Sequence, residues 1–131
     1  ELYRLEPGHM TWAQHDQAAR RNGCTLAPVT SAEEAEAVMR AARGQTVWIG
    51  AVRHGRGNGP GADHWHWSNG EPWAYSRWCR GEPNNYAGQE NRVQMYGRRE
   101  FRPPWGMHAN DGEWNDINGA WTGPAVYKVG S

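Results

Sequence analysis

The chain has 131 residues, of which 14 are basic and 14 are acidic, so its formal net charge is zero. This length suits one domain with its own core, and the balanced charge excludes the positive field that attracts nucleic acid or an anionic membrane. Seventeen glycines, eight prolines and nine tryptophans indicate many loops anchored by large aromatic side chains. No apolar run approaches the roughly 20 residues of a membrane-spanning helix, so we expect no membrane insertion.

The N-terminal residues carry the signals of a strand followed by a helix. Residues 2–5 alternate between apolar and polar side chains, and Glu6-Pro7-Gly8 predicts a turn after them. Thr11, with Gln14 three residues later, forms a capping box that begins a helix. Asn22-Gly23 should end this helix. Its buried face is expected to consist of Trp12, Ala18 and Ala19.

A second helix and a buried strand follow. Ser31 and Glu34 form another capping box, opening a helix through about Ala42 that Gly44 then ends. The residues expected on its buried face are Ala35, Val38, Met39 and Ala42. Residues 46–50, Thr-Val-Trp-Ile-Gly, predict a buried strand. Two helices followed by strands and a long irregular region indicate the α+β class.

The segment 51–81 has little regular pattern, and the glycines and proline between 53 and 63 predict a flexible loop. His64-Trp65-His66-Trp67 alternates, so the tryptophans should face the interior and the histidines should face outward together. A His-x-His pair on a strand is able to bind zinc. No third ligand is evident, however, so solvated histidines are the favoured interpretation.

Two more strands are expected near the C-terminus. One covers residues 92–96, and the other covers 125–129 and should pair with the first strand, which would bring the termini together. Between them, residues 97–112 form an insertion that carries Arg98, Arg99, Phe101, Arg102, Trp105 and His108. A solvated loop anchored by one or two rings is favoured over a surface on which sugars or bases stack.

The stretch from Glu82 to Asp116 contains nearly every good calcium ligand in the chain. The candidate ligands are Glu82, Asn84, Glu90, Asn115 and Asp116. Three carboxylates and two carboxamides are the hard oxygen donors that calcium accepts, whereas zinc and iron-sulfur clusters favour imidazole or thiolate. The alternative interpretation of the Glu-Pro-Asn-Asn run is an ordinary polar turn.

Local geometry supports convergence of these ligands. A cis Glu82-Pro83 bond would turn the side chains of Glu82 and Asn84 toward one point. The run at 114–116 reads as the start of a strand in which Trp114 is buried and the next two side chains face the ion. The Asp116 carbonyl oxygen is a further candidate donor.

At these positions the sequence resembles the C-type lectin-like family, whose calcium and sugar site combines Glu-Pro-Asn, a later Glu and a Trp-Asn-Asp run. Trp-Ile-Gly at 48–50 resembles the core motif of the family. The resemblance implies a C-type lectin-like α+β fold over residues 1–131, with two helices flanking small antiparallel sheets and a long irregular calcium-binding loop region.

The resemblance also implies a function and a partner. The five candidate ligands would hold Ca2+ and, with it, the vicinal hydroxyls of mannose-type sugars, namely mannose, glucose, N-acetylglucosamine and fucose. In the family the order Gln-Pro-Asp goes with galactose instead. The implied partners are glycans or glycoproteins outside the cell or on its surface. Whether the chain is part of a larger multidomain protein stays open.

Departures from the family pattern leave other questions open. Its usual disulfide cysteines are absent, since Arg92 and Gly119 occupy one pair of positions, and Ala19 or a neighbour and Tyr127 the other. The pairing of Cys24 with Cys79 is not settled by sequence. A second calcium ion would have to use Asn85, Asn91 and Asp63, which carry too little charge, so we expect one ion.

Two other functional classes are alternatives to a lectin. One is a calcium-ordered module that binds a protein, ice or a mineral without binding sugar, an alternative that the insertion at 97–112 motivates. The other is an enzyme, which is disfavoured because neither cysteine lies in a recognisable nucleophile motif and the six histidines are scattered. Nucleic-acid binding is not expected.

Overall fold

The structure is a computed structural model that describes residues 2–55, 57, 59–97 and 111–130. The elements in chain order are β1 (Tyr3–Met10), α1 (Trp12–Arg21), β2 (Cys24–Leu26), α2 (Ala32–Ala42), β3 (Val47–Arg53), β4 (Trp65–Trp67), the 3-10 helix η1 (Tyr86–Gly88), β5 (Arg92–Met95), β6 (Trp114–Ile117) and β7 (Gly123–Val129). Two helices and a mixed sheet confirm the α+β class. Neither α-helix in this part of the chain has the length and apolar character needed to span a bilayer.

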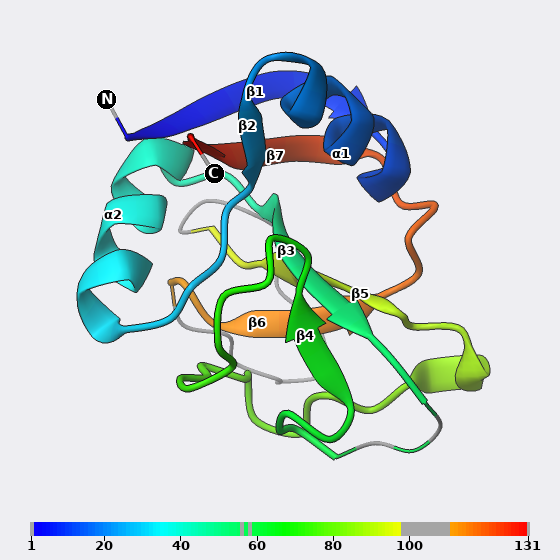
Figure 1. Cartoon of the computed structure of the whole chain (residues 1–131). Coiled ribbons are helices and arrows are strands. Elements are labelled where there is room, and N and C mark those ends of the chain that lie inside the picture. Colours follow the sequence, from blue (N-terminus) through cyan, green and yellow to red (C-terminus); the bar gives the residue numbers. More distant parts are fainter. Residues whose placement is uncertain (1, 56, 58, 98–110, 131) are drawn as a thin grey trace.

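The strands form one connected sheet in the order β1-β7-β3-β5-β6, with β2 added to β7 and β4 added to β3 (Figure 1). The ladders are antiparallel except for a single parallel pair, Trp48 opposite Ala125, where β3 meets β7. This pair joins the terminal strands β1 and β7 to strands β3, β4 and β5, which flank the long loop. Tyr3 lies opposite Lys128, so the predicted pairing of first and last strands is confirmed.

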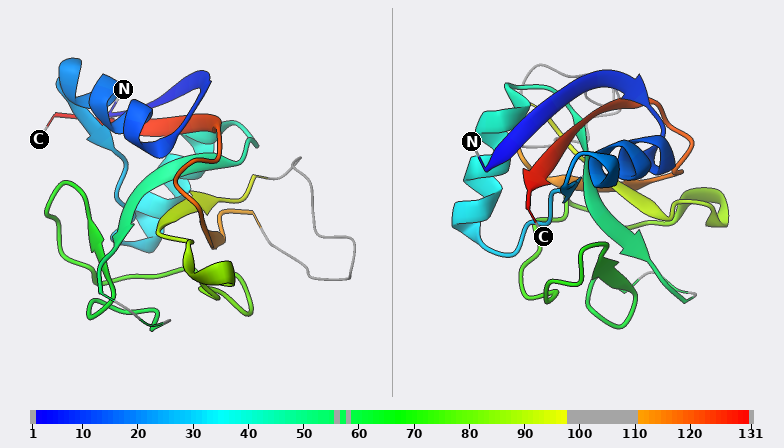
Figure 2. Two further views of the ribbon diagram at one scale, coloured as in Figure 1. Left: turned by 90° about the vertical axis from the view of Figure 1, so that its right-hand side faces the viewer. Right: turned by 45° about the horizontal axis from the view of Figure 1, so that its top comes forward.

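Alternation along β3 produces a hydrophobic core on each face of the sheet. Val47, Ile49 and Ala51 belong to the core that α2 covers. Trp48 lies in the other core, which α1 covers with Trp12. Because successive strand residues point to opposite faces, one strand serves both cores. Figure 2 shows the two helices on different sides of the strands.

Helix α1 has the predicted caps but a different buried face. Thr11 and Gln14 form the expected capping box, and Asn22 is the C-cap. Ala18 is only half-buried, whereas His15 is fully buried. The His15 Nε2 lies 2.7 Å from the Gly123 carbonyl oxygen, which requires that nitrogen to donate, so Nδ1 accepts from the Tyr127 hydroxyl at 2.8 Å. Burial lowers the pKa of His15.

Helix α2 has the predicted end but only half of the predicted capping box. Ser31 accepts from the Glu34 N–H at 3.0 Å, but the Glu34 carboxylate accepts from Thr30 and from the Lys128 ammonium instead of from the Ser31 N–H. The second capping box is therefore only half formed. The helix ends at Ala42, as predicted, with Arg43 as a left-handed C-cap at φ 54° and Gly44 following at φ 82°.

The predicted turn at Glu6-Pro7-Gly8 is wrong. Strand β1 continues through these residues to Met10, and the pairing with β7 shifts register between Glu6 and Met10. Pro7 removes one backbone donor and the ladder accommodates it as a bulge. Pairing with β7 therefore overrides the local turn preference.

A cluster of tryptophans anchors the long loop between β3 and β5. Trp73 stacks on Trp67 at a ring distance of 4.6 Å, and it meets Trp114 edge-on at 5.7 Å. Trp65 and Trp78 complete the cluster at 5.1 Å from each other. Cys24 and Cys79, both of which the structure describes, are buried and form no disulfide. Packing of the tryptophan rings, rather than a disulfide, therefore holds these segments together.

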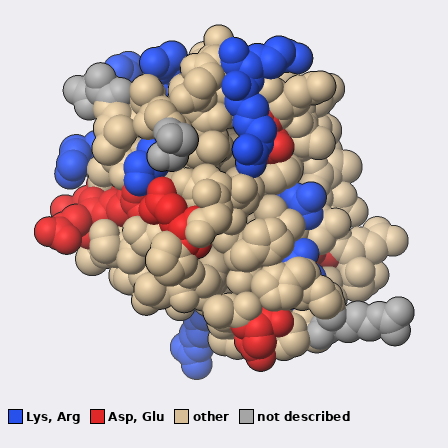
Figure 3. All heavy atoms as spheres, in the orientation of Figure 1, with Lys and Arg blue, Asp and Glu red and all other residues tan. Residues whose placement is uncertain are grey.

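Basic side chains are unevenly distributed even though the net charge is zero. Figure 3 shows many of them in the upper part of the molecule, with the most continuous group over α1 and β2 and separate ones toward the C-terminal end of α2. Acidic side chains lie in separate groups in the same view.

Removal of Trp73 should weaken both the fold and the neighbouring loops. Trp73→Ala is expected to cost about 3 kcal/mol of unfolding free energy and to reduce affinity for divalent cations, because Trp114 leads directly into Asn115 and Asp116. Urea denaturation and calorimetric titration measure the two effects. Trp121→Ala is the control, since Trp121 packs on Trp48 in the other core and should affect stability alone. Equal loss of cation affinity in both variants would contradict this role for the cluster.

Candidate functional site

Three acidic side chains that are distant in sequence converge at the end of β5 and β6. Oxygen atoms of Glu82, Glu90 and Asp116 all lie within 4.8 Å of one another. Asp116 is fully buried on β6, while Glu82 and Glu90 are half-buried in the loop that precedes β5. This is the one group of three or more His, Cys, Asp or Glu residues with suitable spacing in the described part of the chain.

The Glu82-Pro83 peptide bond is cis, as the sequence predicted. The three residues after Pro83 direct their backbone N–H groups at the carboxylates. Asn84 N–H donates to Asp116 Oδ1 at 3.1 Å, Asn85 N–H donates to Oδ2 at 2.8 Å, and Tyr86 N–H donates to Glu90 Oε1 at 2.9 Å. The loop is thereby attached to β6 through the carboxylate of Asp116.

Both predicted carboxamide ligands lie beside the acidic group. Asn84 Oδ1 accepts from the same Tyr86 N–H as Glu90, at 3.3 Å. The Asn115 amide lies between Gln94 and Glu82. In one orientation its nitrogen donates to Gln94 Oε1 at 2.9 Å, and in the swapped orientation it donates to Glu82 Oε2 at 3.1 Å and approaches the Asp116 carbonyl at 3.3 Å. All five predicted site residues are therefore brought together.

Arg53, at the end of β3, is a site residue that the sequence interpretation missed. Its Nη2 donates to Asp116 Oδ2 at 2.7 Å, its Nε donates to the Glu90 carbonyl oxygen at 2.8 Å, and its guanidinium lies 4.5 Å from the centre of the Trp65 ring. The Arg53 side chain is 6% exposed. It is thus a buried cation inside the acidic group, joining β6 to the segment that carries Glu90.

Burial, together with the neighbouring negative charge, raises the pKa of two of the candidate ligands. Burial is the main cause that raises the pKa of Glu82 to about 8, and the neighbouring carboxylates of Asp116 and Glu90 raise it further. Burial also raises the pKa of Glu90 to about 7, against the lowering effect of the Tyr86 N–H. Protons therefore partly neutralise the group near neutral pH.

The donor set suits a hard divalent cation. Three carboxylates and two carboxamides offer only oxygen atoms, the chemistry that calcium requires, and the group lacks the imidazole or thiolate typical of zinc sites. Asn84 is exposed and two of the carboxylates are half-buried. Solvent therefore reaches one side of the group, where a further ligand could approach.

The residues weighed for a second ion have other roles. Asn85 Oδ1 accepts from the Glu90 N–H at 3.1 Å, and Asn91 Oδ1 accepts from the Gly119 N–H at 3.3 Å. Asp63 is 80% exposed and lies 3.5 Å from His64. These three side chains each serve a different loop contact.

The histidines of the long loop are not arranged as predicted. Trp65 and Trp67 are buried as expected, but His66 faces His54 rather than His64, with 2.9 Å between their Nδ1 atoms. His64 lies against the loop glycines and Asp63. The basic and aromatic residues of the 97–112 insertion, from Arg98 to His108, lie outside the described residues.

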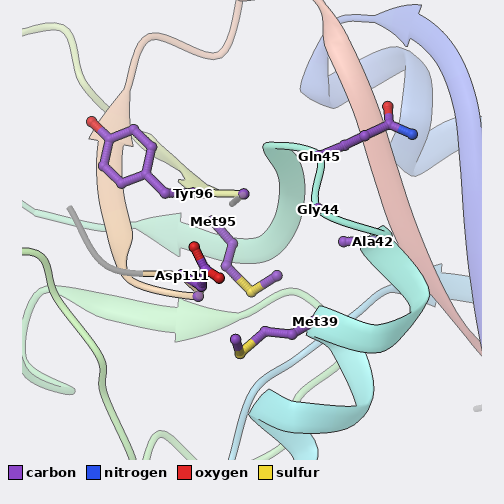
Figure 4. A pocket seen from close by; sticks show the side chains of 9 residues that line it. Met39, Ala42, Gly44, Gln45, Met95, Tyr96 and Asp111 are labelled. Carbon is purple, nitrogen blue, oxygen red and sulfur yellow. The ribbon is translucent and has the colours of Figure 1, made fainter. Parts of the chain in front are cut away.

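A separate small pocket lies where α2 ends. Its volume is about 40 Å³, and Met39, Met95, Tyr96, Gln45 and Asp111 contribute to its lining. Figure 4 shows the side chains of Met39 and Met95 entering the space from α2 and β5. This volume is about that of a single water molecule, so it does not accommodate a sugar.

Calcium affinity should fall as the pH is lowered. Glu82 and Glu90 carry protons below about pH 8 and pH 7 when no ion is bound, and a cation must displace those protons. We expect roughly tenfold or more weaker calcium binding at pH 6 than at pH 8, measured by calorimetric titration. An affinity that is constant over this range would contradict carboxylate ligation.

The same pKa shifts predict how the stabilising effect of calcium on the fold depends on pH. A carboxyl group whose pKa is raised on folding stabilises the ion-free fold below its unfolded value of 4.5 and loses that contribution as the pH rises through about 7 and 8. The increase in melting temperature caused by calcium should therefore be larger at pH 8 than at pH 6.

Arg53 should matter most when no cation is bound. Arg53→Gln leaves the buried Asp116 without its counter-ion, and we expect a loss of about 3 kcal/mol of unfolding free energy in chelator. The loss should be smaller in saturating calcium, because the divalent ion supplies positive charge. Arg53→Lys keeps the charge with fewer donors and should be intermediate. Identical losses with and without calcium would show that Arg53 is a structural ion-pair partner alone.

Comparison with known proteins identifies the family of this chain. The model described as Lectin C-type domain matches residues 8–126. Ladderlectin from Oncorhynchus mykiss is 39% identical over 54 residues, 41% of this chain and 23% of that protein. A lectoxin, a C-type lectin from Thrasops jacksonii, is 33% identical over 102 residues, 72% of this chain and 61% of that protein. The chain thus covers less than two thirds of the length of either relative.

Solved structures have the same fold. The cow carbohydrate-recognition domain of CD23, determined in the presence of GlcNAc2Man3 oligosaccharide, superposes with a TM-score of 0.74 at 26% identity, covering 95% of this chain and 84% of that one. A calcium-independent type II antifreeze protein superposes with a TM-score of 0.71 at 25% identity, covering 95% and 82%. With a family match over nearly the whole sequence, this chain belongs to the Lectin C-type domain family, a family of binding domains rather than enzymes.

Proposed function

We propose that this chain is a calcium-dependent carbohydrate-binding domain for mannose-type sugars. The observation that carries the proposal is the convergence of three carboxylates and two carboxamides, Glu82, Asn84, Glu90, Asn115 and Asp116, at one solvent-accessible point. Domains of this family commonly bind calcium. The same five residues are proposed as ligands of the ion and of the sugar.

Calcium, when bound there, would offer coordination positions to two vicinal hydroxyls of a sugar. The side chains around it supply the remaining interactions. The carboxylates of Glu82 and Glu90 accept hydrogen bonds from sugar hydroxyls, and the amides of Asn84 and Asn115 donate hydrogen bonds to hydroxyl oxygens. Each hydroxyl would then be both donor and acceptor, so the positions of acids and amides select the stereochemistry of the diol.

The mannose class is proposed from two features. Glutamate precedes Pro83 and asparagine follows it, the order that accompanies mannose-type sugars in the family. The structurally similar cow CD23 domain was crystallised with an oligosaccharide that contains mannose and N-acetylglucosamine. A shallow site of this kind binds one monosaccharide weakly, so we propose that useful binding relies on several copies or on extended glycans, at glycoproteins outside the cell.

A second candidate is supported by Arg53. Because a buried guanidinium already pairs with Asp116, the loops are held together by contacts of the chain itself. The chain is also similar to an antifreeze protein described as calcium-independent. These observations favour, as the alternative, a surface-interaction module for a protein, ice or mineral that does not need sugar binding.

A glycan array with calcium and with chelator tests the proposal. We expect binding to mannose, glucose, N-acetylglucosamine or fucose termini that chelator abolishes, because the hydroxyls need the cation and its ligands. Glu82→Gln removes a ligand charge and should abolish binding. The matched variant Asp63→Asn removes an exposed carboxylate of the neighbouring loop and should bind normally. If calorimetry shows that calcium is bound and no glycan is retained, the surface-interaction alternative replaces the lectin proposal.

A further inference from the structure

A groove between β1 and α2 combines an apolar wall with positive charge that has no ion-pair partner among the described residues. Its volume is about 640 Å³, and its lining includes Arg4 and Leu5 from β1 and Ala37, Arg40 and Ala41 from α2. The three α2 positions lie at i, i+3 and i+4 and so share one stripe of the helix. Two of them are alanines, whose small side chains leave room beside the strand.

Three arginines border this groove, Arg4, Arg40 and Arg43. All three are exposed, and none forms an ion pair with another described residue, in contrast to Arg20 and Arg53, which pair with Asp16 and Asp116. Guanidinium groups bind carboxylates through paired N–H donors, so the charge of the groove complements an anionic ligand.

The backbone of β1 offers a second kind of contact. β1 lies at one end of the strand order, with β7 on its one paired side. The opposite edge of an end strand presents unpaired N–H and C=O groups to an added chain. This edge is usable from Tyr3 to Glu6, because Pro7 then removes a donor and the ladder shifts register.

We propose that this groove binds an extended acidic peptide segment of a partner protein. The peptide adds a strand to the free edge of β1, its backbone pairs with residues 3–6, and its carboxylates contact Arg4, Arg40 and Arg43. Its apolar side chains lie against Leu5, Ala37 and Ala41. Addition of an extended peptide to the exposed edge of a sheet, with its alternate side chains in neighbouring pockets, is a known mode of peptide recognition.

The apolar wall and the strand edge favour a peptide over a sulfated polysaccharide. A polysaccharide would use the three guanidinium groups but would leave Leu5, Ala37 and Ala41 without apolar partners. It would also leave the backbone donors of β1 without the regular spacing of acceptors that a peptide strand provides.

The groove lies away from the candidate calcium site. β1 and α2 are at the opposite end of the molecule from η1 in the views of Figures 1 and 2. Peptide binding would therefore neither require calcium nor compete with sugar, and the proposal does not depend on the proposed lectin function.

Fluorescence anisotropy with a labelled eight-residue peptide of alternating Glu and Val tests this inference on the 131-residue chain. We expect saturable binding that is unchanged by chelator, and at least tenfold weaker binding of a Gln-Val peptide. Arg4→Gln with Arg40→Gln should weaken binding at least tenfold. The matched double variant Arg21→Gln with Arg80→Gln removes two exposed arginines elsewhere and should bind normally.

Peptides methylated on alternate backbone nitrogens distinguish strand addition from simple charge attraction. Only every second N–H of an added strand faces β1, so methylation of one alternate set should abolish binding and methylation of the other should preserve it. Equal binding by both sets, equal loss in both double variants, or no binding of the Glu-Val peptide would overturn the proposal. Tighter binding of heparin than of the peptide, lost in Arg4→Gln with Arg40→Gln, would assign the groove to sulfated polysaccharides instead.

Discussion

Repulsion among three carboxylates is the constraint on which the candidate site depends. Glu82, Glu90 and Asp116 lie within 4.8 Å of one another, and all three are at least partly withdrawn from water, where like charges interact strongly. The ion-free chain relieves this repulsion in three ways. Protons are held more tightly by Glu82 and Glu90, backbone N–H groups of residues 84–86 bind the carboxylates, and Arg53 places a positive charge beside Asp116.

The loop that carries the candidate ligands also needs a scaffold, and the disulfides usual in the family are absent. Tryptophans provide the connection. Trp114 precedes Asn115 and Asp116 on β6 and contacts Trp67, Trp73 and Trp78, which come from β4 and from the segment after it. Large rings bury much apolar area and hold defined relative orientations. The ligand-bearing strand is therefore fixed to the long loop by packing, which suits a chain whose two cysteines form no disulfide.

Local signals in the sequence predicted much of this structure. The features that the sequence predicted correctly depend on nearby residues or on a motif. They are the capping box of Thr11 and Gln14, the strand at 125–129 and the convergence of acidic side chains between Glu82 and Asp116. Tertiary interactions explain the errors. Pairing with β7 carries β1 through Glu6-Pro7-Gly8, and the Glu34 carboxylate bonds to Thr30 and to the Lys128 ammonium instead of completing its capping box.

Arg53 could not be identified from sequence because its partner is 63 positions away. It lies in a run of ordinary strand residues, and only the pairing of β3 with β5 and β4 brings it beside Glu90 and Trp65. The available signal for Arg53 is its position: it is a basic residue three positions after Trp-Ile-Gly and two positions before Gly55, where the glycine-rich loop begins.

Charge balance connects these observations. Three ionised carboxylates and one guanidinium leave two negative charges, which equal in magnitude the charge of one calcium ion. A domain with the same ligands and no buried arginine would carry one more negative charge and would need the cation more to hold its loops. If calcium binds as we propose, Arg53 thus takes over part of the structural role of the ion. Arg53 and the backbone N–H groups of residues 84–86 already hold the candidate ligands together. Under the proposed function, the assembly of these side chains and the occupancy of the site by a cation are therefore separate properties.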